Sequence, residues 1–287
     1  MEIKSFFDED TFTVTFVVFD PATKDAVIID PVMDYDPHGS ATSTKSVDEV
    51  TDFVKSKGLN LHYILETHAH ADHLSGSQLL KERFPKAKVG IGANITKVQD
   101  LFKGIFNLGD GFATDGSQFD TLLTEDKDLV AGSIKIKTLF TPGHTPACSS
   151  YVIEDAVFTG DALFMPDFGT GRCDFPAGSA EDLYNSITNK LYTLPDSTRV
   201  FVGHDYAPGG RGYAWESTIG EEKEKNVQLP VSRSKQDFVK FRTDRDKQLS
   251  APRLIFQSVQ VNINAGHLPE PGPNGIAYLK MPLNVSG

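Results

Sequence analysis

The sequence predicts an α/β fold in which two mixed β-sheets are covered by helices. Short apolar runs rich in Val, Ile and Phe recur along the chain, and such runs are typical of strands. Between them, residues 46–57 and 179–192 carry apolar side chains three or four positions apart, which is the spacing of a helix that buries one face. The order of strands, helix, strands, helix, with several hairpins, favours two mixed sheets over a single parallel sheet.

The N-terminal part begins with a predicted hairpin. Residues 12–19 alternate Thr with Phe and Val, residues 26–30 form a second apolar run, and residues 20–25 between them have the composition of a turn. Residues 37–44 are rich in Gly, Ser, Thr and Pro and are expected to form a loop. The helix predicted over residues 46–57 follows this loop.

The rest of the chain contains further predicted strands and then changes in character. Strands are expected at residues 61–66, 88–91, 133–139, 149–153, 156–159 and 199–202. Residues 221–225 form a charge run that is expected to be a solvated helical face, and residues 234–249 are expected to form a charged helix. Residues 268–282 are rich in Pro and Gly and are expected to be coil. We expect one domain over residues 1–287, with a helical and coil extension from about residue 230 to 287.

Composition and charge exclude several classes of function. The formal net charge of −11 argues against nucleic-acid binding, which needs a basic face, and against an anionic membrane surface. No apolar run approaches the ~20 residues of a spanning helix. The first ten residues show no export signal, and two cysteines, Cys148 and Cys173, make no disulfide framework. A cytoplasmic location is therefore expected, and both cysteines are expected to be packing or incidental residues.

Four side chains that can bind a metal follow the predicted strand 61–66 within six residues: His68, His70, Asp72 and His73. Residues two apart in an extended loop face the same way, so His68 and His70 can point at one spot and Asp72 and His73 at a neighbouring one. Imidazole and carboxylate groups are ligands suited to zinc or iron. This spacing therefore predicts a metal site at the end of a strand.

Three other predicted strands end in the same way, with glycine and then a possible ligand. They place His144 after Gly143, Asp161 after Gly160, and His204 after Gly203. Glycine lets the backbone turn sharply just before the ligand. Strand ends that meet at one edge of a sandwich would bring His144, Asp161 and His204 next to the first cluster.

The motif series THAHADH, GHT, GDA and GHD resembles that of the metallo-β-lactamase superfamily, over about residues 12–226. The resemblance implies a four-layer αββα sandwich with the metal site at one edge of the two sheets. In hydrolases of the superfamily two zinc ions share the site and activate a water. By that pattern one zinc would be held by His68, His70 and His144 and the other by Asp72, His73 and His204, with Asp161 bridging.

A narrower resemblance leads to a different metal. Residues 170–175, TGRCDF, are similar to an element of the glutathione persulfide dioxygenases, also called sulfur dioxygenases, and residues 203–226 look like their bacterial branch. Glyoxalase II enzymes usually carry aromatic-Glu-Gly after the corresponding Gly-Lys or Gly-Arg. The dioxygenase resemblance implies one Fe(II) per chain. Its ligands would be His68, His144 and Asp161, and His70, Asp72, His73 and His204 would line the pocket.

Three residues are candidates for binding glutathione, which carries two carboxylates and one ammonium group. Arg172 can grip a carboxylate in bidentate fashion, although an ion pair with Asp174 is an equal alternative. Tyr206 matches a tyrosine that contacts glutathione in the glyoxalase II family, although a buried structural tyrosine is equally open. Arg211 lies on the next Gly-rich loop, where it either rims the pocket or belongs to a plain surface loop.

The expected function is that of a non-haem iron dioxygenase of sulfur metabolism and hydrogen sulfide oxidation. It would convert glutathione persulfide, O2 and water to sulfite and glutathione, and a homo-oligomer is expected. The alternative is a zinc-dependent glutathione thioester hydrolase of the glyoxalase II type. A third possibility is a non-catalytic metal-binding protein on this fold, against which the complete set of ligands argues.

Overall fold

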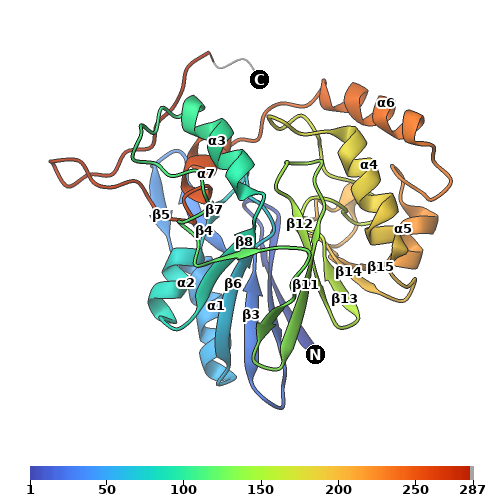
Figure 1. The fold of residues 1–287 in the computed structure, drawn as a ribbon, viewed down its shortest axis with the longest axis horizontal. Helices are drawn as coiled ribbons and strands as arrows, with labels where there is room; N and C mark the ends of the chain where they lie inside the picture. Colours follow the sequence, from blue (N-terminus) through green and yellow to red (C-terminus); the bar gives the residue numbers. More distant parts are fainter. Residues whose placement is uncertain (285–287) are drawn as a thin grey trace.

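In the computed structural model, which describes residues 1–284, two six-stranded sheets face each other and helices cover both outer faces (Figure 1). The first sheet has the order β1 (Glu2–Asp8), β2 (Thr13–Phe19), β3 (Asp25–Ile29), β6 (Asn60–Glu66), β8 (Lys88–Gly92), β9 (Thr121–Leu123). Its first three strands are antiparallel and β3, β6, β8 and β9 are parallel.

The second sheet is antiparallel except where β13 and β14 run parallel. Its order is β10 (Leu129–Ala131), β11 (Ile134–Phe140), β12 (Ser149–Ile153), β13 (Ala156–Phe158), β14 (Arg199–Phe201), β15 (Glu216–Thr218). A small third sheet has the order β5 (Ala41–Ser43), β4 (Val32–Asp36), β7 (Leu74–Ser75). The predicted loop 37–44 therefore contains the short strand β5, and the sequence pattern did not predict the strand β1.

The helices divide between the two outer faces. Next to the first sheet lie α1 (Lys45–Ser56), α2 (Ser77–Arg83), α3 (Ile95–Ile105) and α7 (Ile255–Asn262). Next to the second sheet lie α4 (Ala180–Asn189), α5 (Ile219–Lys225) and α6 (Lys235–Asp246), with the short 3-10 turn η1 (Leu191–Thr193). A second 3-10 turn, η2 (Pro208–Gly210), follows β14. No helix among residues 1–284 is long and apolar enough to cross a membrane.

Alternating side chains of the strands build three apolar layers. On β2, Phe16 and Val18 point into the space between the sheets, whereas Val17 and Phe19 face the helices. This alternation, repeated on both sheets, produces the αββα sandwich that the sequence predicts, and the fold prediction is confirmed.

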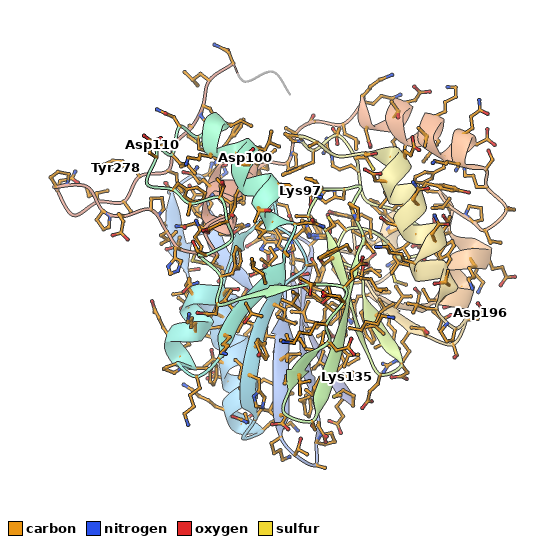
Figure 2. The ribbon with its side chains drawn as sticks, viewed as in Figure 1. Lys97, Asp100, Asp110, Lys135, Asp196 and Tyr278 are labelled. Carbon is orange, nitrogen blue, oxygen red and sulfur yellow. The ribbon has the colours of Figure 1, made fainter. Side chains whose placement is uncertain are left out.

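Of two predictions for the C-terminal part, the structure corrects one and confirms the other. The charge run 221–225 is helical as predicted, but Glu222 is completely buried, so a wholly solvated face is wrong. Residues 268–282 contain no helix or strand, as predicted, and Figure 2 shows Tyr278, which is 59% exposed, on a segment that projects from the body.

Candidate metal centre

The histidine-rich loop follows β6 and is buried at the edge of the sandwich. His68, His70 and His73 are each at most 1% exposed. The loop is held by Asn262 at the end of α7, whose side-chain amide donates to the carbonyl oxygens of His70 and His73 at 2.8 Å each. A residue almost 200 positions away therefore fixes the backbone that carries the ligands.

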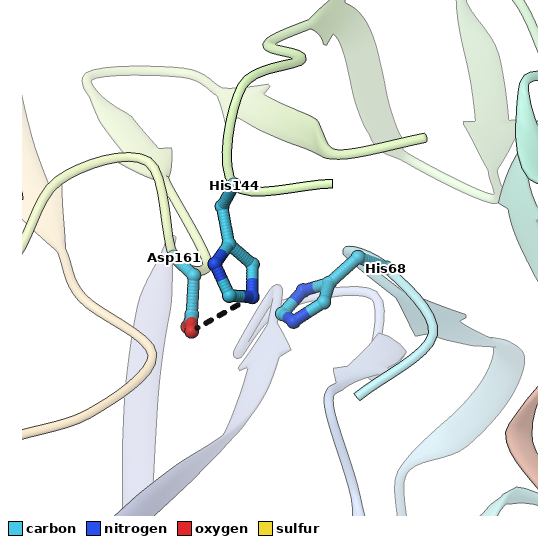
Figure 3. Close-up of side chains that lie close together, drawn as sticks. All are labelled: His68, His144 and Asp161. Atoms are coloured by element: carbon cyan, nitrogen blue, oxygen red, sulfur yellow. Dashed lines mark ion pairs between the residues drawn. The ribbon is translucent and has the colours of Figure 1, made fainter. Parts of the chain in front are cut away.

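Three of the predicted ligands form one compact group. Metal-binding atoms of His68, His144 and Asp161 all lie within 4.8 Å of one another, and Figure 3 shows the three side chains converging. The Nε2 atom of His144 is 3.5 Å from Oδ2 of Asp161. Gly143 and Gly160 permit these turns: both have positive φ, and an added Cβ would fall 2.4 Å from the backbone of Leu183 at Gly143 and 2.5 Å from a neighbouring side chain at Gly160.

The remaining predicted ligands adjoin this group. Binding atoms of His70, Asp72 and His73 form a second set within 4.8 Å. His204 lies between the two sets, with its Nε2 atom 3.3 Å from Oδ1 of Asp161 and 3.4 Å from Oδ2 of Asp72. All seven side chains that the sequence singled out as ligands or pocket residues are thus gathered at one edge of the sheets.

Several ring and carboxylate atoms in this cluster are buried without a hydrogen-bond partner. They include Nε2 of His68, His73 and His204 and Oδ1 of Asp161. A buried polar atom without a partner costs about 1–3 kcal/mol, so several of them facing one spot are unfavourable in the isolated chain. A bound cation would satisfy these atoms together, and the residues present therefore fit a metal ion.

The protonation of His68 and His73 also suits a metal. Burial, together with the charge of His70, keeps the pKa of His68 well below its ordinary value, and burial lowers the pKa of His73 to about 4. Neutral imidazole is the form that ligates. The Nδ1 atom of His144 lies 2.7 Å from the carbonyl oxygen of Arg172, which leaves its Nε2 atom to face Asp161.

Two buried carboxylates behind the loop had no sequence prediction. The Nε2 atom of His70 is 3.0 Å from Asp30 and 3.4 Å from Glu66. Although burial opposes it, these carboxylates raise the pKa of His70 well above its ordinary value. Asp30 directly follows an apolar strand, as the predicted ligands do, so the same pattern could have identified it.

The predicted substrate-binding residues are mostly engaged within the protein. Arg172 makes a bidentate ion pair with Asp174, with both contacts at 2.6 Å, and donates to the carbonyl oxygen of Ser250. Arg211 is bound by two carboxylates, Asp167 and Asp205. Tyr206 is 40% exposed and stacks on the ring of His204.

Two cavities flank the metal centre. One of about 290 Å³ lies on the His144 side and is mainly apolar, with Phe102, Phe175 and Phe256 among its walls. The other, of about 180 Å³, lies on the Asp161 side and is lined in part by Tyr206. Neither cysteine belongs to the groups of candidate metal ligands, and both are buried. Burial raises the pKa of both thiols, that of Cys148 to about 12.

The fold and the ligand cluster together define a metal-dependent enzyme of the two-sheet sandwich type. The chain belongs to the metallo-β-lactamase superfamily, whose model matches residues 9–204.

Relatives that carry different names match nearly all of the chain. A Burkholderia pseudomallei protein named "Probable metallo-hydrolase" is 45% identical, covering 99% of this chain and 100% of its own, and glyoxylase B2 of Dictyostelium discoideum is 47% identical, covering 99% and 97%. The mitochondrial persulfide dioxygenase ETHE1 of Homo sapiens is 31% identical, covering 92% and 88%. The crystal structure of ETHE1 from Myxococcus xanthus is similar with a TM-score of 0.74 and 34% identity, covering 93% and 100%.

Proposed function

We propose that this protein is a persulfide dioxygenase that converts glutathione persulfide, O2 and water to glutathione and sulfurous acid, which ionises to sulfite. Atoms balance when one O2 and one H2O supply the three oxygens of the product. The observation that carries the proposal is the contact between the segment 170–175, whose sequence resembles a dioxygenase element, and the group of two histidines and one carboxylate formed by His68, His144 and Asp161. A face of this kind leaves open positions on Fe(II).

The segment 170–175, on which the dioxygenase resemblance depends, touches this group directly. The carbonyl oxygen of Arg172 orients the ring of His144, and the ring of Phe175 packs on that histidine with centroids 6.1 Å apart. Gly171 lies against Asp161, where an added Cβ would fall 2.0 Å from the carbonyl oxygen of Asp161. The element that suggests the dioxygenase therefore supports two of the three proposed ligands.

The chemistry divides between metal and protein. Bound Fe(II) supplies the redox capacity towards O2 that zinc lacks. The chain keeps His68 neutral, holds the proton of His144 on Nδ1, and excludes water by burying the ligands. The apolar walls formed by Phe102 and Phe175 add to this dry environment.

A second candidate is a zinc-dependent glutathione thioester hydrolase. The second set of ligands, His70, Asp72 and His73, with His204 beside Asp161, could hold a second ion. The names metallo-hydrolase and glyoxylase belong to relatives that are 45–47% identical, and by these names the comparisons favour the hydrolase over the dioxygenase. The ligand geometry is compatible with both, so metal and reaction must be measured.

The test is to purify the chain without added metal and to count metals by mass spectrometry. Oxygen uptake with glutathione persulfide and anaerobic hydrolysis of a glutathione thioester are then measured on the same sample. The dioxygenase predicts about one iron per chain, and O2 uptake in step with sulfite release. Two zinc ions with thioester hydrolysis and no O2 uptake would reject it. The exposed-loop variant His38→Ala serves as the control for loss of a histidine.

A further inference from the structure

The cavity on the Asp161 side has an unusual concentration of positive charge. Besides Asp161 and Tyr206, its walls include three arginines, Arg172, Arg242 and Arg245. The chain as a whole carries a formal net charge of −11. Three guanidinium groups around a cavity of about 180 Å³ therefore form a local exception that sits next to a metal ligand.

Two of these arginines are already neutralised by the protein. Arg172 is held by Asp174. Arg242 is 1% exposed and forms a buried ion pair with Asp246, and it also donates to the carbonyl oxygen of Thr170. The charges of Arg172 and Arg242 are each balanced by a carboxylate of the protein, so neither guanidinium is free to bind a ligand.

The third arginine has no such partner. Among residues 1–284 the guanidinium of Arg245 makes no ion pair and no hydrogen bond, and the residue is exposed. The neighbouring carboxylate of Asp244 is shared between Lys240 and Lys247. One positive charge of this cavity is thus uncompensated.

The helix that carries Arg245 is nonetheless held in place. Arg245 lies in the last turn of α6, directly before Asp246, whose carboxylate is buried in the ion pair with Arg242. The carboxylate of Asp246 accepts a hydrogen bond from the backbone N–H of Cys173 at 2.8 Å, which ties the end of α6 to the segment beside the metal centre. The uncompensated guanidinium is therefore carried by a helix that is anchored to the segment beside the metal centre.

We infer that Arg245 binds a carboxylate of glutathione while the sulfur end of the molecule lies at the metal centre. A guanidinium can donate two parallel hydrogen bonds to a carboxylate. Among residues 1–284 no acceptor takes these bonds from Arg245, so a carboxylate of the ligand can accept them. The inference rests on the proposed function in taking glutathione as the carrier. It applies equally to a persulfide and a thioester, because glutathione is the product of both reactions.

The test is calorimetric binding of reduced glutathione to the metal-loaded, full-length chain, so that no turnover is needed. Arg245→Gln should raise the dissociation constant for glutathione roughly tenfold or more, because a charged hydrogen-bonded pair is lost. Arg245→Lys should recover part of the affinity. Lys240→Gln removes one positive charge from the same helix and should bind like the wild type, because Lys240 does not line this cavity.

The diethyl ester of glutathione identifies the group that is bound. It lacks both carboxylates, so it should bind the wild type and Arg245→Gln with equal, weakened affinity. The inference is overturned if Arg245→Gln binds glutathione as tightly as the wild type, if the substitution weakens the ester equally, or if glutathione does not bind the wild type. Absent O2 uptake with Arg245-dependent glutathione binding would reject only the dioxygenase reaction.

Discussion

The Nδ1 atom of His144 lies 2.7 Å from the main-chain carbonyl oxygen of Arg172. A carbonyl oxygen can only accept, so the histidine donates this hydrogen bond and its proton stays on Nδ1. The Nε2 atom, which faces Asp161, is then free to ligate a metal. One backbone atom of the segment 170–175 thereby sets the tautomer of a proposed ligand.

Gly171, the residue before Arg172, offers a direct test of whether the segment 170–175 supports the proposed metal ligands. Gly171→Ala would place a Cβ 2.0 Å from the carbonyl oxygen of Asp161, so the segment or the ligand must move. We expect metal affinity to fall about 10–100-fold, as when groups behind a ligand are disturbed. Gly212→Ala is the matched control, because an added Cβ there has no neighbour within 4 Å. Equal metal affinities of the two variants, measured by competition with a chelator, would refute the role of Gly171.

Replacing candidate ligands one at a time tests how many metal ions the chain binds. His144→Ala or Asp161→Ala should remove both the iron and the activity, since each supplies one of three ligands in the proposed site. His73→Ala should retain one iron per chain, because His73 belongs to the second set. Metal counting on the purified variants distinguishes the two arrangements. A fall from two ions to one in His73→Ala would favour the hydrolase.

The sequence predicted the parts of the site that lie at strand ends and missed those brought in by packing. His144, Asp161 and His204 each follow a short apolar run and a glycine, so their local pattern was visible. Asn262 and Arg245 lie on C-terminal helices whose position depends on side-chain contacts with segments far away in the chain. No local spacing encodes such contacts, and the charge pattern around Glu222 even suggested exposure where the fold buries it.

The carboxylate of Asp30 is expected to matter for the metal although it does not belong to the predicted ligands. It contacts His70 at 3.0 Å and accepts hydrogen bonds from the backbone N–H and hydroxyl of Thr67. Asp30→Asn keeps the shape but removes the charge, and metal affinity should fall about 10–100-fold. Asp25→Asn disrupts a comparable pair with His62 at the other end of β3 and should leave metal binding unchanged. Similar metal affinity of both variants would contradict this role.

Glu222 should make stability depend on pH. Burial raises its pKa to about 7, so between about pH 4.5 and 7 the folded chain holds a proton that the unfolded chain releases. Stability is therefore highest below about pH 4.5 for this group and is lost as pH rises through 7, by on the order of 3 kcal/mol.

The measurement is the unfolding free energy of metal-free protein in urea at pH 5 and pH 8. Glu222→Gln cannot ionise, so its stability relative to the wild type should increase between the two pH values. The exposed neighbour Glu224→Gln should show no such change. A pH dependence of Glu222→Gln identical to that of the wild type would show that the buried carboxyl is not the cause.

The buried pair between Arg242 and Asp246 should be costly to break from one side. The Nε atom of Arg242 donates to Asp246 at 2.9 Å, and both residues are at most 5% exposed. Arg242→Met leaves the carboxylate without its cation and should cost about 3–5 kcal/mol of unfolding free energy. The double substitution Arg242→Met with Asp246→Leu should cost less than the single one, because no buried charge remains unpaired. Urea denaturation of both metal-free variants decides the matter, and a double variant less stable than Arg242→Met would mean that the pair stabilises the fold by more than mutual neutralisation.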